Sequence, residues 1–92
     1  MEFLYDPEKN AKLIKERGVG FEDVIEAIAD DRLLLDATHP NREKYPHQRL
    51  MIVEIARYTY AVPYLMDGEV YVLKTIYPDR RYKKLLEIKD GK

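Results

Sequence analysis

Alternating apolar and polar positions in the second half of the chain predict an antiparallel β-sheet. Two runs of β-branched and aromatic residues flank Asp67-Gly68, a dipeptide typical of the type I′ turn that closes a tight hairpin. A strand over residues 49–56 precedes this hairpin, and the apolar run 33–37 predicts a fourth strand. With Asp67 and Gly68 as the loop, the expected cross-strand pairs are Met66 with Glu69, Tyr64 with Tyr71, Val62 with Leu73, and Tyr60 with Thr75.

The first third of the chain has the residue spacing of amphipathic helices, preceded by a short strand over residues 1–5. Asp6 is suited to cap a helix that starts at Pro7, and Gly18 is suited to end it in the left-handed conformation. A second helix begins at Phe21, because apolar residues recur from there at the i, i+3, i+4 and i+7 positions. Its apolar face comprises Phe21, Val24, Ile25 and Ile28.

The basic segment near the C-terminus predicts a short third helix over residues 80–87. Pro78 ends the sheet, because proline cannot donate to a strand ladder, and Asp79 is a suitable N-cap for the helix. The apolar face of this helix comprises Tyr82, Leu85 and Leu86, and its basic face comprises Arg81 and Lys84.

Together, these elements predict a single α+β domain in which two N-terminal helices pack on an antiparallel β-sheet meander with a short C-terminal helix. We expect the hairpin side that carries Val70 and Val72 to face the helices, because it is the more apolar side. The side that carries Tyr60, Tyr64 and Tyr71 then stays open. The expected core comprises Ile14, Phe21, Val24, Ile25, Ile28, Leu34, Met51, Val53, Ile55, Leu65, Val70, Val72 and Ile76.

Composition excludes several classes of protein. The chain has 92 residues, no cysteine and no apolar run near the roughly 18 residues that a membrane span needs. This excludes disulfide scaffolds, thiolate metal sites and membrane-spanning helices, and the expected compartment is the cytoplasm. Residues 1–36 carry 5 basic and 10 acidic side chains, whereas residues 74–92 carry 7 basic and 3 acidic ones. From charge alone, the basic end fits a solvated helix face better than a phosphate-binding surface.

No contiguous catalytic motif is present. The chain lacks a glycine-rich phosphate loop, a Gly-x-Ser-x-Gly elbow, a His-Glu-x-x-His helix and an EF-hand loop. A polar loop over residues 38–48 holds both His39 and His47, and long loops in small domains are often functional. These two histidines, eight residues apart in a loop, could bind a metal only together with distant carboxylates, so no cofactor is expected. Acid–base catalysis stays open, because it needs positioned groups rather than a contiguous signature.

Two short segments resemble the BrnT family of type II toxins. The first combines the run Asp6-Pro7-Glu8-Lys9-Asn10 with Lys15-x-x-Gly18-Val19-x-Phe21-Glu22, and the second is Ile76-Tyr77-Pro78-Asp79-Arg80-Arg81. The resemblance implies a RelE-like fold and an endoribonuclease that cleaves RNA and restrains translation. It also implies a cognate antitoxin, a small DNA-binding protein that neutralises the toxin in a hetero-oligomer.

The sequence departs from the family pattern at positions that bear on mechanism. Arg17 precedes Gly18, where the family often has histidine, and Asp79 precedes Arg80, where a small residue is common. RNA cleavage by the RelE-like route needs cations for the developing phosphorane charge, a group that helps deprotonate the 2′-hydroxyl, and a donor for the leaving oxygen. The candidate catalytic residues are Lys74, Arg80, Tyr77 and His47, and the candidate RNA-binding residues are Lys15, Arg81, Lys84 and Tyr82.

Lys74 and Arg80 are the expected charge-stabilising pair, since the turn at Pro78 would bring both cations to one rim of the sheet near Tyr77. Proton transfer is open between the candidates His47, Tyr77, Tyr82 and Lys15. Partner binding is expected at an exposed sheet edge or over the tyrosine-rich face, because Pro63 cannot donate to a ladder and so indicates an edge or bulge.

Two other functions stay open. A non-catalytic partner-binding module with the same fold that has lost ribonuclease activity fits the missing histidine and the mild net charge of -1. Direct DNA binding fits less well, because no segment resembles a helix-turn-helix recognition helix and the two N-terminal helices are acidic overall.

Overall fold

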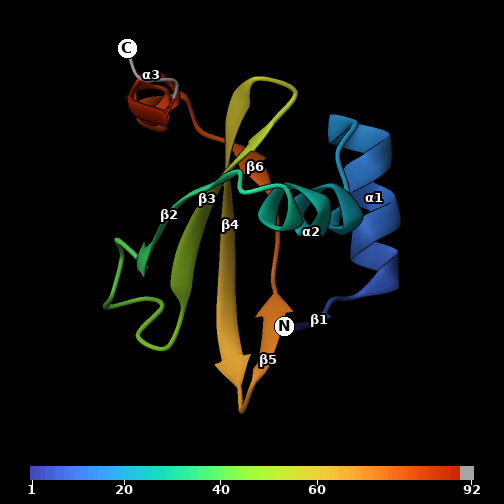
Figure 1. Cartoon of the computed structure of the whole chain (residues 1–92). Coiled ribbons are helices and arrows are strands. Elements are labelled where there is room, and N and C mark those ends of the chain that lie inside the picture. Colours follow the sequence, from blue (N-terminus) through green and yellow to red (C-terminus); the bar gives the residue numbers. More distant parts are fainter. Residues whose placement is uncertain (90–92) are drawn as a thin grey trace.

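A six-stranded sheet forms the centre of the protein in the part of the chain that the structure describes (Figure 1). The structure is a computed structural model and describes residues 1–89. The strands are β1 (Glu2–Leu4), β2 (Leu33–Thr38), β3 (Arg49–Ile55), β4 (Tyr58–Asp67), β5 (Val70–Leu73) and β6 (Tyr77–Pro78). The helices are α1 (Pro7–Arg17), α2 (Phe21–Ala29) and α3 (Lys84–Lys89), with a 3₁₀ turn, η1 (Arg80–Tyr82), before α3.

The α+β class is confirmed, with two N-terminal helices, a strand meander and a short C-terminal helix. The strand order is β1-β5-β4-β3-β2, and β6 pairs with β4. Strands β2 to β5 run antiparallel to their neighbours, but β1 pairs in parallel with β5, with Leu4 opposite Val72. The sheet is therefore mixed rather than wholly antiparallel. An alternating pattern predicts a strand but not its direction, and β1 takes the outer side of β5 that the meander leaves free.

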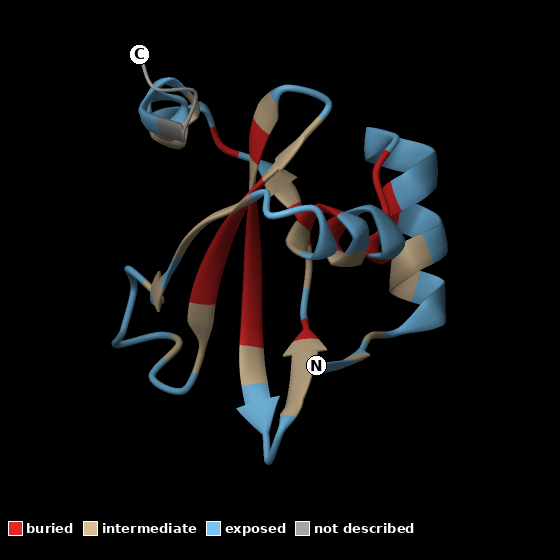
Figure 2. Ribbon diagram, in the orientation of Figure 1, coloured by how far each residue is buried: buried red, intermediate tan, exposed pale blue. Residues whose placement is uncertain are grey.

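Helices α1 and α2 cover one face of the sheet. Leu13 of α1 and Phe21 and Val24 of α2 are buried against the strands, and the buried residues of the strands gather in the middle of β3 and β4 (Figure 2). The two helices follow each other closely in the chain, and the apolar faces of both pack on the same face of the sheet. The strand and loop residues of this cluster are Met51, Val53, Val62, Tyr64, Leu73 and Ile76.

The tyrosine-bearing side of the hairpin, not the side with Val70 and Val72, faces the helices. Val62, Tyr64 and Leu73 are buried in the helix-covered cluster, which reverses the predicted orientation of the two faces. Tyr64 can be buried there because its hydroxyl donates to Asp36 Oδ1 (2.5 Å) and accepts from Arg49 Nε (3.0 Å). Burial and the hydrogen bond to Asp36 raise the pKa of Tyr64 to about 12.

The opposite face of the sheet is partly covered by the C-terminal segment. Leu50, Ile52 and Ala61 are buried there, and Tyr77, Tyr82 and Leu85 pack against them. The predicted helix over residues 80–87 is thus a 3₁₀ turn followed by α3, and its predicted apolar face is confirmed for Tyr82 and Leu85. Both faces of the sheet are apolar. A comparison of their apolar residues therefore did not predict which face the helices cover.

Five members of the predicted core are buried: Phe21, Val24, Met51, Val53 and Ile76. Ile14 was expected in the core and is 52% exposed, because α1 turns the neighbouring Leu13 toward the sheet instead. The remaining members are half-buried, and they are Ile25, Ile28, Leu34, Ile55, Leu65, Val70 and Val72.

The hairpin turn lies one residue later than predicted. Asp67 pairs with Val70, so Gly68 and Glu69 form the loop, and Tyr64 lies opposite Leu73 rather than Tyr71. Gly68 has a positive φ of 61° in the first loop position, as in type II′ turns. The two positive φ angles of a type I′ turn occur instead between β3 and β4, at Ala56 (52°) and Arg57 (63°).

The predicted helix caps are confirmed. Asp6 accepts a hydrogen bond from the Glu8 N–H (2.9 Å), and Gly18 ends α1 with a φ of 75°. Asp79 likewise accepts from the Arg81 N–H (3.1 Å) at the start of η1. Asp6 and Gly18 fix where α1 begins and ends, and Asp79 fixes where the C-terminal segment leaves the sheet.

Gly20 joins α1 to α2 at close range. A Cβ at this position would lie 2.8 Å from Asn10 Oδ1, which accepts a hydrogen bond from the Phe21 N–H (2.7 Å). We predict that Gly20→Ala lowers the free energy of unfolding by about 1–3 kcal/mol, because the added methyl displaces this capping bond.

A double-mutant cycle in urea tests this explanation. Asn10→Ala alone should also destabilise the protein, but Gly20→Ala should cost less in the Asn10→Ala background than in the wild type. Strictly additive effects would show that the clash with Asn10 is not the cause.

Candidate functional site

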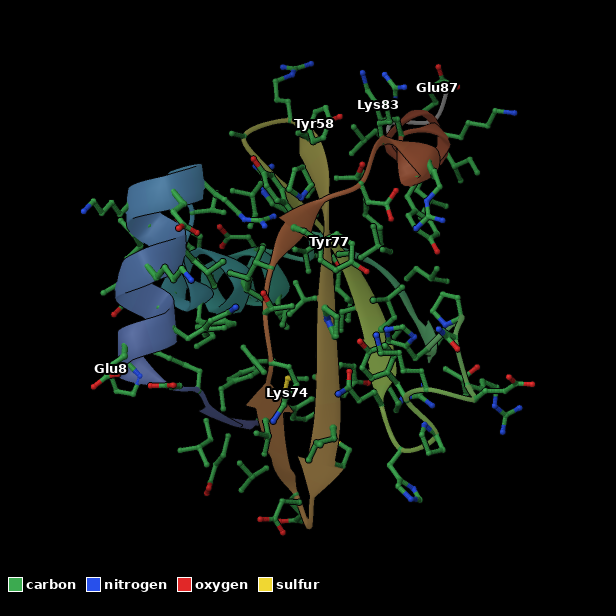
Figure 3. All side chains as sticks on the ribbon, turned by 180° about the vertical axis from the view of Figure 1, so that it is seen from behind. Glu8, Tyr58, Lys74, Tyr77, Lys83 and Glu87 are labelled. Carbon is green, nitrogen blue, oxygen red and sulfur yellow. The ribbon has the colours of Figure 1, made fainter. Side chains whose placement is uncertain are left out.

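A pocket of about 300 Å³ opens on the sheet face that lies away from α2. Its lining comes from the loop between β2 and β3, from β4 and from the segment between β5 and β6, and it comprises His39, Tyr45, Gln48, Pro63, Lys74, Thr75 and Tyr77. Figure 3 views this face and shows Lys74 and Tyr77 on it. We call it the site pocket. It brings together two of the predicted catalytic residues, Lys74 and Tyr77.

The strand ladder is interrupted beside this pocket. Residues 74–76 lie between β5 and β6 without strand structure, and the Lys74 N–H donates to the Pro63 carbonyl (2.9 Å). The nitrogen of Pro63 points to the same side as its carbonyl, so the missing donor faces the interruption. Pro63 therefore lies in a central strand, opposite an irregular segment. Of the two predicted positions, a sheet edge or a bulge, the sheet edge is wrong.

Tyr77 is a protonated hydrogen-bond donor in the site pocket. It belongs to β6, pairs with Ala61 and is half-buried against the cluster on this face. Burial raises the pKa of the Tyr77 phenol above its usual value, the negative charge of Asp79 adds to the rise, and Arg81 opposes it. The hydroxyl therefore keeps its proton around pH 7.

His39 rather than His47 lies in this pocket. The His39 N–H donates to the Gln48 carbonyl (3.1 Å), which closes the loop, and its ring packs on Tyr45 with the ring centroids 4.7 Å apart. Nδ1 of His39 accepts from the Asn41 N–H (3.1 Å), which places the proton of a neutral ring on Nε2. In that state His39 can donate through Nε2 but cannot serve there as a base.

Arg81, four residues beyond Tyr77 in the chain, is held by Asp79. Arg81 Nε and Nη2 donate to the two carboxylate oxygens of Asp79 at 2.9 and 2.7 Å. The Asp79 side chain is only 6% exposed, whereas Arg81 is 72% exposed and lies over the Tyr82 ring. Arg81 therefore has a fixed direction and an open face, as a phosphate-binding arginine requires.

The Asp79–Arg81 pair makes stability depend on pH. The hydrogen bonds from Arg81 hold the pKa of the Asp79 carboxyl below its usual value. Because the folded-state pKa is depressed, this stabilisation is complete above about pH 5 and is lost as pH falls through the lowered pKa.

Asp79→Asn keeps a capping oxygen but removes the charge. We predict that its urea midpoint lies below that of the wild type at pH 7 and that the two midpoints converge below about pH 4. Midpoints that stay equally far apart from pH 7 to pH 3 would contradict the role of the carboxylate charge.

The other predicted site residues are spread over the surface. Arg80, Lys84, His47 and Lys15 are exposed, and Lys15 lies on α1, which packs on the opposite face. Tyr82 is half-buried beneath the C-terminal segment. The Asp79 N–H donates to the Thr59 carbonyl (2.9 Å), four residues along β4 from Pro63, so the backbone near Arg80 is anchored about 13 Å from that of Lys74. Arg80 is therefore not among the residues that line the site pocket with Lys74.

Neither the protein-family models nor the curated proteins contain a match to this chain. Within residues 1–89, no helix is long and apolar enough to cross a membrane. The same residues contain no cluster of three or more His, Cys, Asp or Glu side chains that could hold a metal ion.

Sequence reasoning missed His39, Tyr45 and Gln48 as members of the site. The length and polarity of their loop predict a functional segment, and the loop lines the site pocket. The sequence does not show which of its two histidines lines this pocket. His39 directly follows the last residue of β2, Thr38. The hydrogen bonds of a paired strand fix the direction of the side chain that follows it. The position of His39 directly after β2 was therefore the signal that could have identified it.

Proposed function

We propose that this chain is the toxin of a type II toxin–antitoxin pair, a metal-independent endoribonuclease that cleaves RNA and inhibits translation in the cytoplasm. The observation that carries the proposal is the site pocket, which Lys74, Tyr77 and His39 line together. The BrnT-like segments support it, since the second of them contains Tyr77, Asp79 and Arg81.

The proposed reaction uses the RNA's own 2′-hydroxyl as the nucleophile. The 2′-oxygen bonds to the adjacent phosphorus, the bond from phosphorus to the 5′-oxygen breaks, and the products are a 2′,3′-cyclic phosphate and a 5′-hydroxyl. Lys74 stabilises the negative charge that develops on the phosphoryl oxygens. Nε2 of His39 donates a hydrogen bond to these oxygens, and Tyr77 transfers its phenolic proton to the leaving 5′-oxygen and regains a proton from water. Water accepts the 2′-hydroxyl proton.

Arg81 extends the positive surface away from the pocket. Its guanidinium is fixed by Asp79 and remains largely exposed, so it is suited to hold a phosphate of the same RNA strand beyond the cleaved one. Lys84, the first residue of α3, is suited to add a second positive charge to this contact.

The proposed antitoxin partner binds elsewhere than the tyrosine-rich side of the hairpin. Tyr64 is buried beneath the helices, which leaves the exposed sheet edge as the remaining option of the two expected from the sequence. Among residues 1–89, β1 and β2 are the outermost strands of the sheet, and either offers free backbone groups to an added strand.

The experiment that tests the proposed function is RNA cleavage by the purified protein in EDTA, together with growth arrest on expression. We expect cleavage of single-stranded RNA with EDTA present, and growth arrest that co-expression of the proposed antitoxin relieves. His39→Ala should lower cleavage at least tenfold, whereas His47→Ala tests the alternative histidine. Loss of cleavage in His47→Ala but not in His39→Ala would show that the reaction does not take place in the site pocket.

One observation favours a second candidate, the non-catalytic partner-binding module. The site pocket contains no carboxylate, and Nδ1 of His39 is occupied by the Asn41 N–H, so it offers no strong base for the 2′-hydroxyl. A wild-type protein that binds RNA or its partner without cleaving RNA would favour this module.

A further inference from the structure

A second pocket lies beside the site pocket. It has a volume of about 520 Å³ and is formed where β1 ends, where α1 begins and where β5 ends. Lys74 lines both pockets. Figure 3 shows Lys74 on the sheet face, with the first turn of α1, marked by Glu8, to its left and Tyr77 above it. We call it the flanking pocket.

The flanking pocket combines apolar walls with two cations. Leu4 and Val72 are opposite each other in the β1–β5 pair, and Leu4 is 57% exposed although it is a large apolar residue. Lys9 of α1 and Lys74 also line this pocket and supply positive charge. Asp6 also lines the pocket, but its carboxylate is engaged by the Glu8 N–H (2.9 Å) as the cap of α1.

This chemistry fits a nucleotide. A nucleobase is flat and apolar on its faces, and the phosphate beside it is anionic, so the base can cover Leu4 and Val72 while the phosphate contacts a lysine. The volume lies within the usual range of small-molecule pockets, about 300–1,000 Å³. Because Lys74 belongs to both pockets, one RNA strand can cross it with successive nucleotides on either side.

We propose that the flanking pocket binds the nucleotide next to the cleaved phosphodiester, with its base on Leu4 and Val72 and its outer phosphate on Lys9. This inference rests on the proposed function, since it names a second subsite for the same RNA. The pocket then sets how strongly the enzyme holds its substrate on one side of the cleavage point.

The test compares Leu4→Ser and Lys9→Ala with Lys12→Ala, which removes an exposed lysine from the same helix outside this pocket. Substrates are short single-stranded RNAs that carry an abasic nucleotide on one or the other side of the cleaved bond. In the wild type, an abasic nucleotide on one side should lower kcat/KM about tenfold. Leu4→Ser should lose this sensitivity, Lys9→Ala should raise KM about tenfold at nearly unchanged kcat, and Lys12→Ala should behave as wild type.

Binding of an RNA with a single 2′-deoxy nucleotide at the cleaved position separates the two proposals. Binding that weakens in Leu4→Ser and Lys9→Ala supports the flanking pocket even if the wild type cleaves nothing, in which case the proposed function alone fails. An abasic effect that is absent in the wild type, or equal in the wild type and Leu4→Ser, overturns the flanking pocket. Variants that cleave normally but escape the antitoxin overturn it too, because the pocket would then be a protein-binding surface.

Discussion

Lys74→Ala is expected to lower the rate of RNA cleavage by about 10²–10³-fold, the usual effect of removing one preorganised group that stabilises a developing oxyanion. Lys74 is the cation that lines the site pocket, and its backbone is fixed by the hydrogen bond to Pro63 (2.9 Å). Its side chain is exposed, so the free energy of unfolding should change little. The measurement is kcat on a single-stranded RNA, with the urea midpoint of each variant.

Lys12→Ala is the matched control for this experiment. It removes the same charge from an exposed position on α1 and should leave kcat within about twofold of the wild type. Equal losses in both variants would point to net charge rather than to the pocket. Full activity in Lys74→Ala would remove this residue from the reaction.

Phe21→Ala is expected to destabilise the fold more than any substitution in the site, by about 3–5 kcal/mol. Phe21 is 0% exposed, begins α2 and packs against Tyr5 with the ring centroids 4.9 Å apart. Removing the ring leaves a cavity where α1, α2 and the sheet meet. Because small domains are stable by only roughly 5–15 kcal/mol, much of the protein should unfold on mild heating.

Ile14→Ala is the control for this prediction. Ile14 is 52% exposed on α1, so its truncation should cost less than about 1 kcal/mol in the same urea titration. A large loss in Ile14→Ala with a small loss in Phe21→Ala would show that α1 is rotated from its described position.

Much of the fold could be predicted from the sequence because local signals fix local structure. Asp6, Gly18 and Asp79 are caps whose side chains or backbone act within a few residues, and the strands follow from their alternation. The predicted position of the hairpin turn was wrong by one residue, because both Asp67-Gly68 and Gly68-Glu69 are suited to a two-residue turn. Only the pairing along the whole of β4 and β5 decides between them.

The orientation of the sheet could not be predicted, because it depends on contacts between distant segments. Tyr64 is buried under the helices since Asp36 and Arg49, from two other strands, satisfy its hydroxyl. Only some residues of the site pocket were predicted, because the pocket also depends on contacts between distant segments. Tyr77 lies in the segment with the family-like motif and Lys74 lies two residues before the start of that segment, whereas His39 joins them only through the pairing of β2, β3 and β4.

The most direct test of the proposed function is the cleavage of a matched pair of oligonucleotides in EDTA, one all-RNA and one with a single 2′-deoxy nucleotide at the cleaved position. We predict that the wild-type protein cuts the all-RNA strand to give a 2′,3′-cyclic phosphate and leaves the substituted strand uncut at that position, because the nucleophile is missing. Cleavage of both strands, or of neither, would contradict an endoribonuclease that uses the 2′-hydroxyl of its substrate.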